Sequence, residues 1–377
     1  MLNGDQKTRS TLRGKARKKW HDEIRNVPSM GCSLCPEYST CGGLCVSKPL
    51  FWCMDYCCGN PSNCDVVCRS NPKFVDFIRE IGGFEFDSIP RAAVLPSPSV
   101  PKNLPMIFHG NSREGCLPSK SVVLPLARMF DRLSGESKFH SRVELCEKFK
   151  IDRNAIIVLS GTDKDSPIEG WWQIGQDARK QVIRNLKELN IAIATSPNYS
   201  LFVDQPRWDD LHAMKKIAIV HGEMLREGLP AALHINGRTQ VDFERWAKYI
   251  RARPEISSLA YEFATGTGWN GRREQHVNWL LWLARYVGRP LDLFVRGGAD
   301  LLPALRPSFA NVVFIDTASF MRTIKRRRAE ISASGLKWKA APTAVGQPLD
   351  ELLRENVLTV ETWIVGQLPK IRTQMIA

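Results

Sequence analysis

Short apolar segments alternate with longer amphipathic segments over most of the chain after residue 105. The apolar segments are rich in residues that favour strands and are about four to eight residues long, which is typical of β-strands. They span 106–110, 155–161, 191–196, 231–237, 257–265, 291–298 and 312–318, and 121–126 is a weaker candidate. The pattern therefore predicts seven or eight strands.

Amphipathic helices are predicted between most of these strands. In the segment 177–190, for example, Val182, Ile183, Leu186 and Leu189 recur at helical spacing. The segments 207–228, 240–252 and 272–288 follow the same plan. Repeated strand–helix–strand units imply parallel strands. The predicted fold class is therefore α/β, a TIM-like (β/α)8 barrel, and a doubly wound open sheet is the alternative.

The part of the chain before these repeats has a different composition. Residues 86–105 contain five prolines and are predicted to form an extended linker. The expected order of parts is a basic N-terminal arm, a cysteine-rich metal-binding module, the linker, the barrel and a C-terminal helical extension. Their predicted bounds are 1–30, 31–85, 86–105, 106–330 and 331–377.

Positive charge is in excess and unevenly distributed. The formal net charge of the 377 residues is +14 at pH 7 and the isoelectric point is about 9.4. Such an excess favours a polyanionic partner, with nucleic acid ahead of an anionic membrane, although a merely basic soluble protein fits as well. Residues 7–20 contain seven Lys and Arg and no acid, and residues 322–328 contain five. Both segments are typical of phosphate-contacting surfaces or of solvated arms.

No apolar run approaches the roughly 18 residues that a membrane-spanning helix requires. The N-terminus is positively charged but lacks the apolar stretch of a signal peptide. The sequence therefore predicts a cytoplasmic protein with no membrane partner. In that compartment thiols stay reduced, so a disulfide framework is not expected.

Nine cysteines lie within 37 residues near the N-terminus, beginning with the spacing C-x2-C-x5-C-x3-C. Clustered thiols in a reducing compartment indicate metal ligands. Eight thiolates are enough for two tetrahedral zinc ions, whereas four are enough for a [4Fe-4S] cluster, and the spacing leaves zinc and iron–sulfur both open. The predicted ligands are Cys32, Cys35, Cys41, Cys45, Cys53, Cys57, Cys58, Cys64 and Cys68.

Polar residues occupy nearly every position that follows a predicted strand. In a (β/α)8 barrel these positions form the rim that carries the catalytic groups. They include His109, Asn111, Thr162, Asp163, Asp165, Ser196, Asn198, Asp204, His234, Asn236, Arg238, Glu262, Arg296, Asp300 and Asp316. The candidate substrate-binding residues are Asn198, Asp204, Asn236, Arg238 and Arg296, together with Gly266 and Gly268 of the glycine-rich loop GTGWNG.

The last two repeats carry a more specific pattern. The segment LDLFVRGGADLLPALRPSFANVVFIDTASFMRTIKRR resembles the closing segment of the tRNA-guanine transglycosylases. Gly297 and Gly298 match the glycine pair of that family, and Asp316 matches its nucleophilic aspartate. The earlier segments AALHINGR and SLAYEFATGTG resemble its paired base-recognition loops. The similarity extends over roughly residues 105 to 330 in a chain of 377.

The chain also departs from the family pattern. Leu159 stands where the family has an aspartate before Ser-Gly, so Asp163 would have to replace it. The family's zinc ligands beyond the barrel are absent, and the cysteines lie near the N-terminus instead. These departures resemble the DNA-directed relatives of the family, which occur in bacterial DNA-modification and anti-phage systems.

The resemblance implies cleavage of an N-glycosidic bond. Asp316 is expected to stabilise or attack the sugar, and Asp163 or Glu262 to protonate the departing base. The expected function is a DNA glycosylase that removes a modified base in phage defence. A transglycosylase that exchanges guanine for a 7-deazapurine in DNA or tRNA is the close alternative. A non-catalytic, metal-stabilised nucleic-acid-binding protein and an iron–sulfur oxidoreductase remain open, and DNA is favoured over tRNA as the partner.

Overall fold

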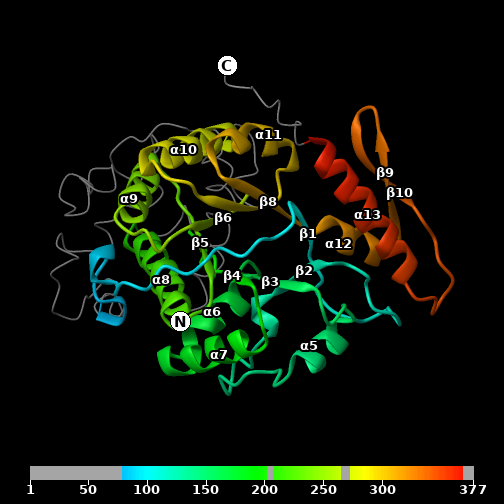
Figure 1. Ribbon diagram of the computed structural model, residues 1–377, viewed down its shortest axis with the longest axis horizontal. Coiled ribbons are helices and arrows are strands. Elements are labelled where there is room, and N and C mark those ends of the chain that lie inside the picture. The colour runs from blue at the N-terminus through cyan, green and yellow to red at the C-terminus, as the bar shows by residue number, and fades with distance from the viewer. Residues whose placement is uncertain (1–78, 202–206, 265–271, 368–377) are drawn as a thin grey trace, which may run out of the picture.

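The computed structural model describes residues 79–201, 207–264 and 272–367 (Figure 1). Eight parallel strands form one sheet in the order β1-β8-β7-β6-β5-β4-β3-β2. They are β1 (Asn103–Pro105), β2 (Ser121–Pro125), β3 (Ile156–Ser160), β4 (Ile193–Thr195), β5 (Ala231–His234), β6 (Ser258–Glu262), β7 (Asp292–Arg296) and β8 (Asn311–Asp316). A parallel bridge between Met106 and Val123 joins the end of β1 to β2, so the sheet closes on itself. The predicted TIM-like α/β barrel is confirmed, and the open sheet is excluded.

Helices surround the sheet, and the four helices predicted from periodicity are all present. The α-helices up to the last strand of the barrel are α5 (Arg142–Phe149), α6 (Asp165–Gln173), α7 (Gln176–Glu188), α8 (Arg207–Arg226), α9 (Gln240–Arg251), α10 (Arg272–Val287) and α11 (Leu302–Leu305), and α12 (Ala318–Ile324) follows β8. Short 3-10 turns are η3 (Phe86–Ser88), η4 (Leu126–Arg128), η6 (Ala299–Leu301) and η7 (Arg306–Ser308). Helix α9 begins with a capping box in which Thr239 and Asp242 satisfy each other's backbone amides.

The barrel interior is a compact apolar plug to which every strand contributes. Side chains along a strand point alternately to its two faces, so alternate residues fill the interior. The interior residues are Leu104, Met106, Val123, Val158, Ile193, Ala232, Ala260, Phe294, Val313 and Ile315. A larger apolar layer fills the space between the sheet and the helices. Because both faces are buried, the strands appear in the sequence as nearly continuous apolar runs.

The segment predicted as a linker packs against the barrel. Phe86 stacks on Trp246 of α9 with 4.7 Å between the ring centroids. Further on, the Ser97 hydroxyl donates a hydrogen bond of 2.7 Å to Asp292 at the start of β7. Strand β1 begins at Asn103, inside this segment, so the barrel starts three residues earlier than the prediction of 106. Proline is compatible with the extended path that this segment takes across the amino ends of the strands.

The connection from β1 to β2, which is described throughout, contains no α-helix. The missing helix is replaced by α13 (Asp350–Gln367), which packs against β1 and α12. The Asp350 carboxylate accepts the amides of Glu114 and Gly115 in that connection at 2.8 and 3.2 Å. Leu353 and Ile364 of α13 are fully buried. The last described helix therefore completes the wall of the barrel.

An antiparallel hairpin separates α12 from α13. Its strands are β9 (Arg327–Ser332) and β10 (Gly335–Ala340), and it lies at the edge of the molecule beside α13 (Figure 1). Within the described residues, no helix has the length and apolar character needed to cross a membrane. The predicted cysteine module and basic N-terminal arm lie outside the described residues.

Candidate active site at the mouth of the barrel

A polar layer lies directly above the apolar plug, at the carboxyl ends of the strands. Its members come two residues after an interior residue of the same strand, so their side chains also point into the barrel. We call this set the mouth layer, and it consists of Ser160, Thr195, His234, Glu262 and Arg296. Apart from Arg296, each is at least nine-tenths buried. Polar groups at the carboxyl end of a parallel barrel are where catalytic residues lie in this fold.

Glu262 and Arg296 form the ion pair of the mouth layer. They are register partners on the adjacent strands β6 and β7. Oε2 of Glu262 lies 3.4 Å from Nη1 of Arg296, and only 4% of the Glu262 side chain is exposed. Oε1 of Glu262 accepts the backbone N–H of Ala264 at 2.6 Å. Burial raises the pKa of Glu262, while the charge of Arg296 and the amide of Ala264 act in the opposite direction.

Arg296 also reaches across the mouth. Its Nη1 donates a hydrogen bond of 3.2 Å to the carbonyl of Thr162, which follows β3. Because β3 and β7 are separated by three strands on either side, this contact links opposite sides of the barrel. The side chain is 19% exposed, so the guanidinium is positioned by the protein and still reaches solvent. An arginine held in this way can orient an anionic or carbonyl group of a substrate.

His234 of β5 lies in the same layer. Burial lowers the pKa of His234 to about 3, and the positive charge of Arg296 adds to the effect. The imidazole is therefore neutral at physiological pH. Its Nδ1 is buried and has no hydrogen-bond partner in the part of the chain that the structure describes. A buried polar atom without a partner is uncommon in folded proteins, and such an atom at a barrel mouth is available to bind a substrate.

The amides of Asn198 and Asn236 lie above β4 and β5. Nδ2 of Asn236 donates to Oδ1 of Asn198 at 2.8 Å and to the carbonyl of Tyr199 at 3.0 Å. The two predicted substrate-binding residues are thus in direct contact, and both are partly exposed. This pairing leaves the Asn198 amide nitrogen and the Asn236 amide oxygen able to contact a polar group of a ligand.

The glycine pair after β7 shapes the loop that holds Glu262. Gly297 has φ of +75°, and a Cβ at this position would lie 2.5 Å from the backbone nitrogen of Ala264. Gly298 has φ of +65° and lies against Phe263. Both positions favour glycine because of the left-handed backbone and because of the close approach. The amide of Ala264 is the hydrogen-bond donor to Glu262, so the glycine pair supports the ion pair indirectly.

Asp316 lies on the other side of the strand from the mouth layer. Val313 and Ile315 of β8 point into the barrel, so Asp316 points out toward the helices, and it is 1% exposed. Its carboxylate accepts the amides of Ala318 and Ser319 at 2.8 and 3.1 Å and also the Ser319 hydroxyl. Burial raises the pKa of Asp316, and these hydrogen bonds oppose the rise. The residue expected to be the nucleophile caps the first turn of α12, and the structure differs from that expectation because strand parity turns the side chain away.

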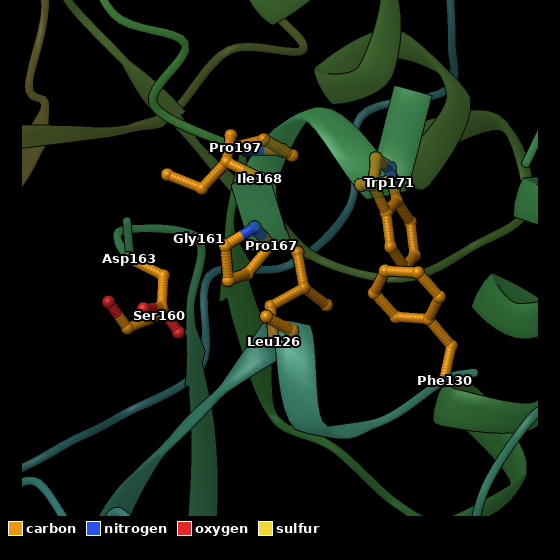
Figure 2. A pocket seen from close by; sticks show the side chains of 10 residues that line it. Leu126, Phe130, Ser160, Gly161, Asp163, Pro167, Ile168, Trp171 and Pro197 are labelled. Carbon is orange, nitrogen blue, oxygen red and sulfur yellow. The ribbon is translucent and has the colours of Figure 1, made fainter. Parts of the chain in front are cut away.

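Asp163 is exposed at the lip of a pocket beside β3. The pocket is shallow, and the roughly 210 Å³ of empty space in it includes open solvent. Figure 2 shows Ser160 and Asp163 on one side of it and Phe130 and Trp171 on the other. The Asp163 carboxylate accepts the amide of Lys164 at 2.7 Å. Asp163 therefore borders the mouth at β3, whereas Glu262, the other predicted acid, lies inside the mouth layer at β6.

Arg238 is turned away from solvent. Nη1 of this residue lies 3.2 Å from Oδ2 of Asp210 on α8, and both side chains are buried. The backbone N–H of Arg238 donates to Asp242 in the capping box of α9. These contacts form a structural ion pair between two elements, and they do not place Arg238 at the mouth of the barrel. Among the other predicted site residues, Asp204, Gly266, Gly268 and the nine cysteines lie outside the described residues.

His234 belongs to the mouth layer but is not among the catalytic or binding residues predicted from the sequence, where it is only one of the rim positions. The signal that could have selected it is the parity of the strand ends, since only every second residue faces the interior. Among the described residues, no group of three or more His, Cys, Asp and Glu side chains is placed to hold a metal ion. The groups that the mouth layer itself offers for catalysis are the carboxyl group of Glu262, the guanidinium of Arg296 and the neutral imidazole of His234.

A scan of the chain against protein-family models gives no match, and a search among curated proteins gives none. Function is therefore inferred from the residues of the barrel mouth and from the distribution of charge.

Proposed function

We propose that this chain is an enzyme that cleaves N-glycosidic bonds in DNA, with Glu262 as the catalytic carboxylate. The observation that carries the proposal is the Glu262–Arg296 pair, which is buried in the mouth layer at 3.4 Å. A carboxyl group with a raised pKa at the catalytic end of a barrel is suited to transfer protons or to stabilise a positively charged sugar. In this proposal Glu262 has the catalytic role that the family resemblance implied for Asp316.

Breaking the bond between a sugar and a base leaves positive charge on the sugar carbon and an electron pair on the base. The ionised Glu262 can stabilise that charge or bond to the carbon, and water then completes the hydrolysis by giving its hydroxyl group to the sugar carbon and its proton to the released base. Arg296 holds Glu262 in place and can donate hydrogen bonds to the departing base. His234, which is neutral, can exchange a hydrogen bond with the base through a ring nitrogen. The base must leave the duplex to reach this layer.

Nucleic acid is the substrate class that the charge favours, because the chain carries a net charge of +14. The resemblance to tRNA-guanine transglycosylases supports the same bond type, and the glycine pair that it matches, Gly297 and Gly298, holds the loop beside Glu262. A modified base in phage DNA remains the expected substrate. Exchange of guanine for a 7-deazapurine is the alternative outcome at the same site.

The test is base release from modified and unmodified duplex DNA, followed by mass spectrometry of the free base and by alkali cleavage of the abasic strand. Glu262→Gln should abolish release while leaving the protein folded. Asp316→Asn is the matched control, since it changes a buried carboxylate of the neighbouring region that faces away from the mouth. Release that needs an added base would identify exchange. Loss of release in Asp316→Asn but not in Glu262→Gln would contradict the proposal.

A second candidate is a nucleic-acid-binding protein without catalysis. It is favoured by one observation, namely that the aspartate matching the family nucleophile caps a helix in this chain. This candidate predicts tight DNA binding, no free base under any condition, and unchanged affinity in Glu262→Gln.

A further inference from the structure

The hairpin β9–β10 and the end of α12 carry a dense cluster of cations. Between residues 321 and 340 there are seven Lys and Arg against one acid, Glu330, so the segment has a net charge of 7 − 1 = +6. All seven cations are exposed. We call this set the basic ribbon, and it consists of Arg322, Lys325, Arg326, Arg327, Arg328, Lys337 and Lys339.

The two faces of the hairpin differ sharply. Ala329 pairs with Trp338 and Ile331 with Leu336 on one face. Ala329 is buried, and Leu336 and Trp338 pack against the core. On the opposite face, Arg328 is the register partner of Lys339, and Glu330 is the register partner of Lys337. Because side chains alternate along each strand, the face of Ala329 and Trp338 is anchored on the protein, while the face of Arg328, Lys337 and Lys339 presents charge to solvent. Arg327 belongs by parity to the anchored face but is exposed, because it lies at the end of the hairpin where β9 begins.

Three members of the basic ribbon have no protein partner among the described residues. The side chains of Lys325, Arg327 and Lys337 make neither a hydrogen bond nor an ion pair there, whereas Arg328 is paired with Glu355 at 3.0 Å. Lysines on an edge strand can serve to prevent strand pairing between molecules. That role does not account for Lys325 and Arg327, which flank the turn between α12 and β9. Unneutralised cations on a fixed scaffold attract a polyanion.

We propose that the basic ribbon binds the phosphate backbone of double-stranded DNA. This inference rests on the proposed function in that it names the same partner, and it identifies the surface that holds the duplex. The major groove of B-form DNA is about 12 Å wide and accepts a two-stranded ribbon, whereas the major groove of A-form RNA is too narrow for side chains to enter.

The experiment compares the full chain with the triple variant Lys325→Ala, Arg327→Ala, Lys337→Ala. Binding of a fluorescent, unmodified 20-base-pair DNA duplex is measured between about 50 and 200 mM salt, where each phosphate contact contributes about 0.9 to the slope of log affinity against log salt. The variant should bind about tenfold or more weakly at the lower salt concentration, and its slope should fall by about 2.7. The matched control is Lys148→Ala, Lys180→Ala, Lys187→Ala on α5 and α7, which lie well away from the hairpin in Figure 1.

Unchanged affinity and slope in the ribbon variant would overturn the proposal. Tighter binding of duplex RNA than of duplex DNA would overturn it as well. Base release at saturating DNA concentration separates this proposal from the proposed function. If the ribbon variant loses affinity but the unmodified chain releases no base, DNA binding by the basic ribbon is supported and the proposed glycosylase activity is refuted. If base is released and the ribbon variant binds DNA normally, the proposed glycosylase activity is supported and DNA binding by the basic ribbon is refuted.

Discussion

The backbone N–H of Ser319 donates to the carboxylate of Asp316 across 3.1 Å, and the Ser319 hydroxyl donates to the same carboxylate. The Ser319 hydroxyl also contacts the carbonyl of Asn356 on α13 at 3.3 Å. Asp316 therefore belongs to a buried polar network that joins β8, α12 and α13. In this chain Asp316 has a structural role.

Replacing Asp316 by Ala should destabilise the protein without removing catalysis. Loss of a helix cap costs about 1 kcal/mol, and leaving buried amides without a partner adds to it, so we expect a loss of about 2–3 kcal/mol in the free energy of unfolding. Urea denaturation measures this loss. Base release per folded molecule should stay within about threefold of the unmodified chain, because the side chain does not face the mouth.

Replacing Glu262 by Gln should abolish base release. It should also change the pH dependence of stability, because the difference in free energy of unfolding between the variant and the unmodified chain should move in favour of the variant as the pH rises from acidic to neutral. The folded-state pKa of Glu262 is raised, so the folded protein binds the proton more tightly than the unfolded chain does. The free energy of unfolding of the unmodified chain therefore falls as pH rises from the ordinary pKa through the raised one. Urea titrations across this range in both proteins test the sign.

The protein should lose stability as the pH falls below about 6.5. His212, His234 and His276 have pKa values lowered to about 3 by burial, and His221 has one lowered to about 4. The unfolded chain binds protons on these residues below about pH 6.5, whereas the folded chain binds them only near pH 3 to 4. Each histidine should then lower the free energy of unfolding by about 1 kcal/mol between about pH 7 and 5.5.

A single histidine tests this linkage. His221 is fully buried and its Nε2 lies 3.2 Å from the carbonyl of Ala231, which Gln can still contact. His221→Gln should make the pH dependence shallower by the amount that one histidine contributes. Equal slopes in the unmodified chain and in His221→Gln would contradict the neutral, buried state of this residue.

Substituting Gly297 by Ala should disturb the mouth. The new Cβ would stand 2.5 Å from the nitrogen of Ala264, and the residue would have to keep a φ of +75°. Left-handed backbone in a residue with a side chain costs about 1–3 kcal/mol. The loop that donates to Glu262 must shift, so base release should fall by about tenfold or more. Gly346→Ala shares the positive φ but has open space around its Cβ, so it should lose stability without losing activity.

The metal content of the purified chain tests the prediction made for the nine cysteines. Two zinc ions per chain, or iron and sulfide with a brown colour, are the two expected results. Elemental analysis and the visible spectrum distinguish them. Removal of the metal by a chelator should lower the melting temperature, because metal binding contributes to folding. A fully folded chain that contains neither metal would refute the prediction.

The strands of the barrel can be predicted because both of their faces are buried, which makes each strand an apolar run bounded by polar residues. The same property hides which residues face the interior. In β8, Phe314 and Ile315 are equally apolar, so hydropathy cannot show that Ile315 and not Asp316 points inward. The sequence identifies Glu262 and Arg296 as rim residues, but their pairing follows from the register of β6 with β7, which a single sequence does not encode locally.

The boundaries of the barrel are harder to predict than its repeats. Asn103 and Pro105 do not resemble a strand, and β1 is only three residues long, so the sequence pattern places its start too late. The contribution of α13 depends on contacts with β1, which lies almost 250 residues earlier in the chain. Contacts at that separation leave no periodic signal, because they depend on the assembled fold.

The position of α13 has a consequence for synthesis of the protein. The wall beside β1 is completed only when the helix Asp350–Gln367 has left the ribosome, so the outer face of β1 and the side of α12 that packs on this helix stay uncovered while the rest of the chain is made. A nascent chain arrested before residue 350 should accordingly be a substrate for chaperones and proteases, even though all eight strands have already emerged.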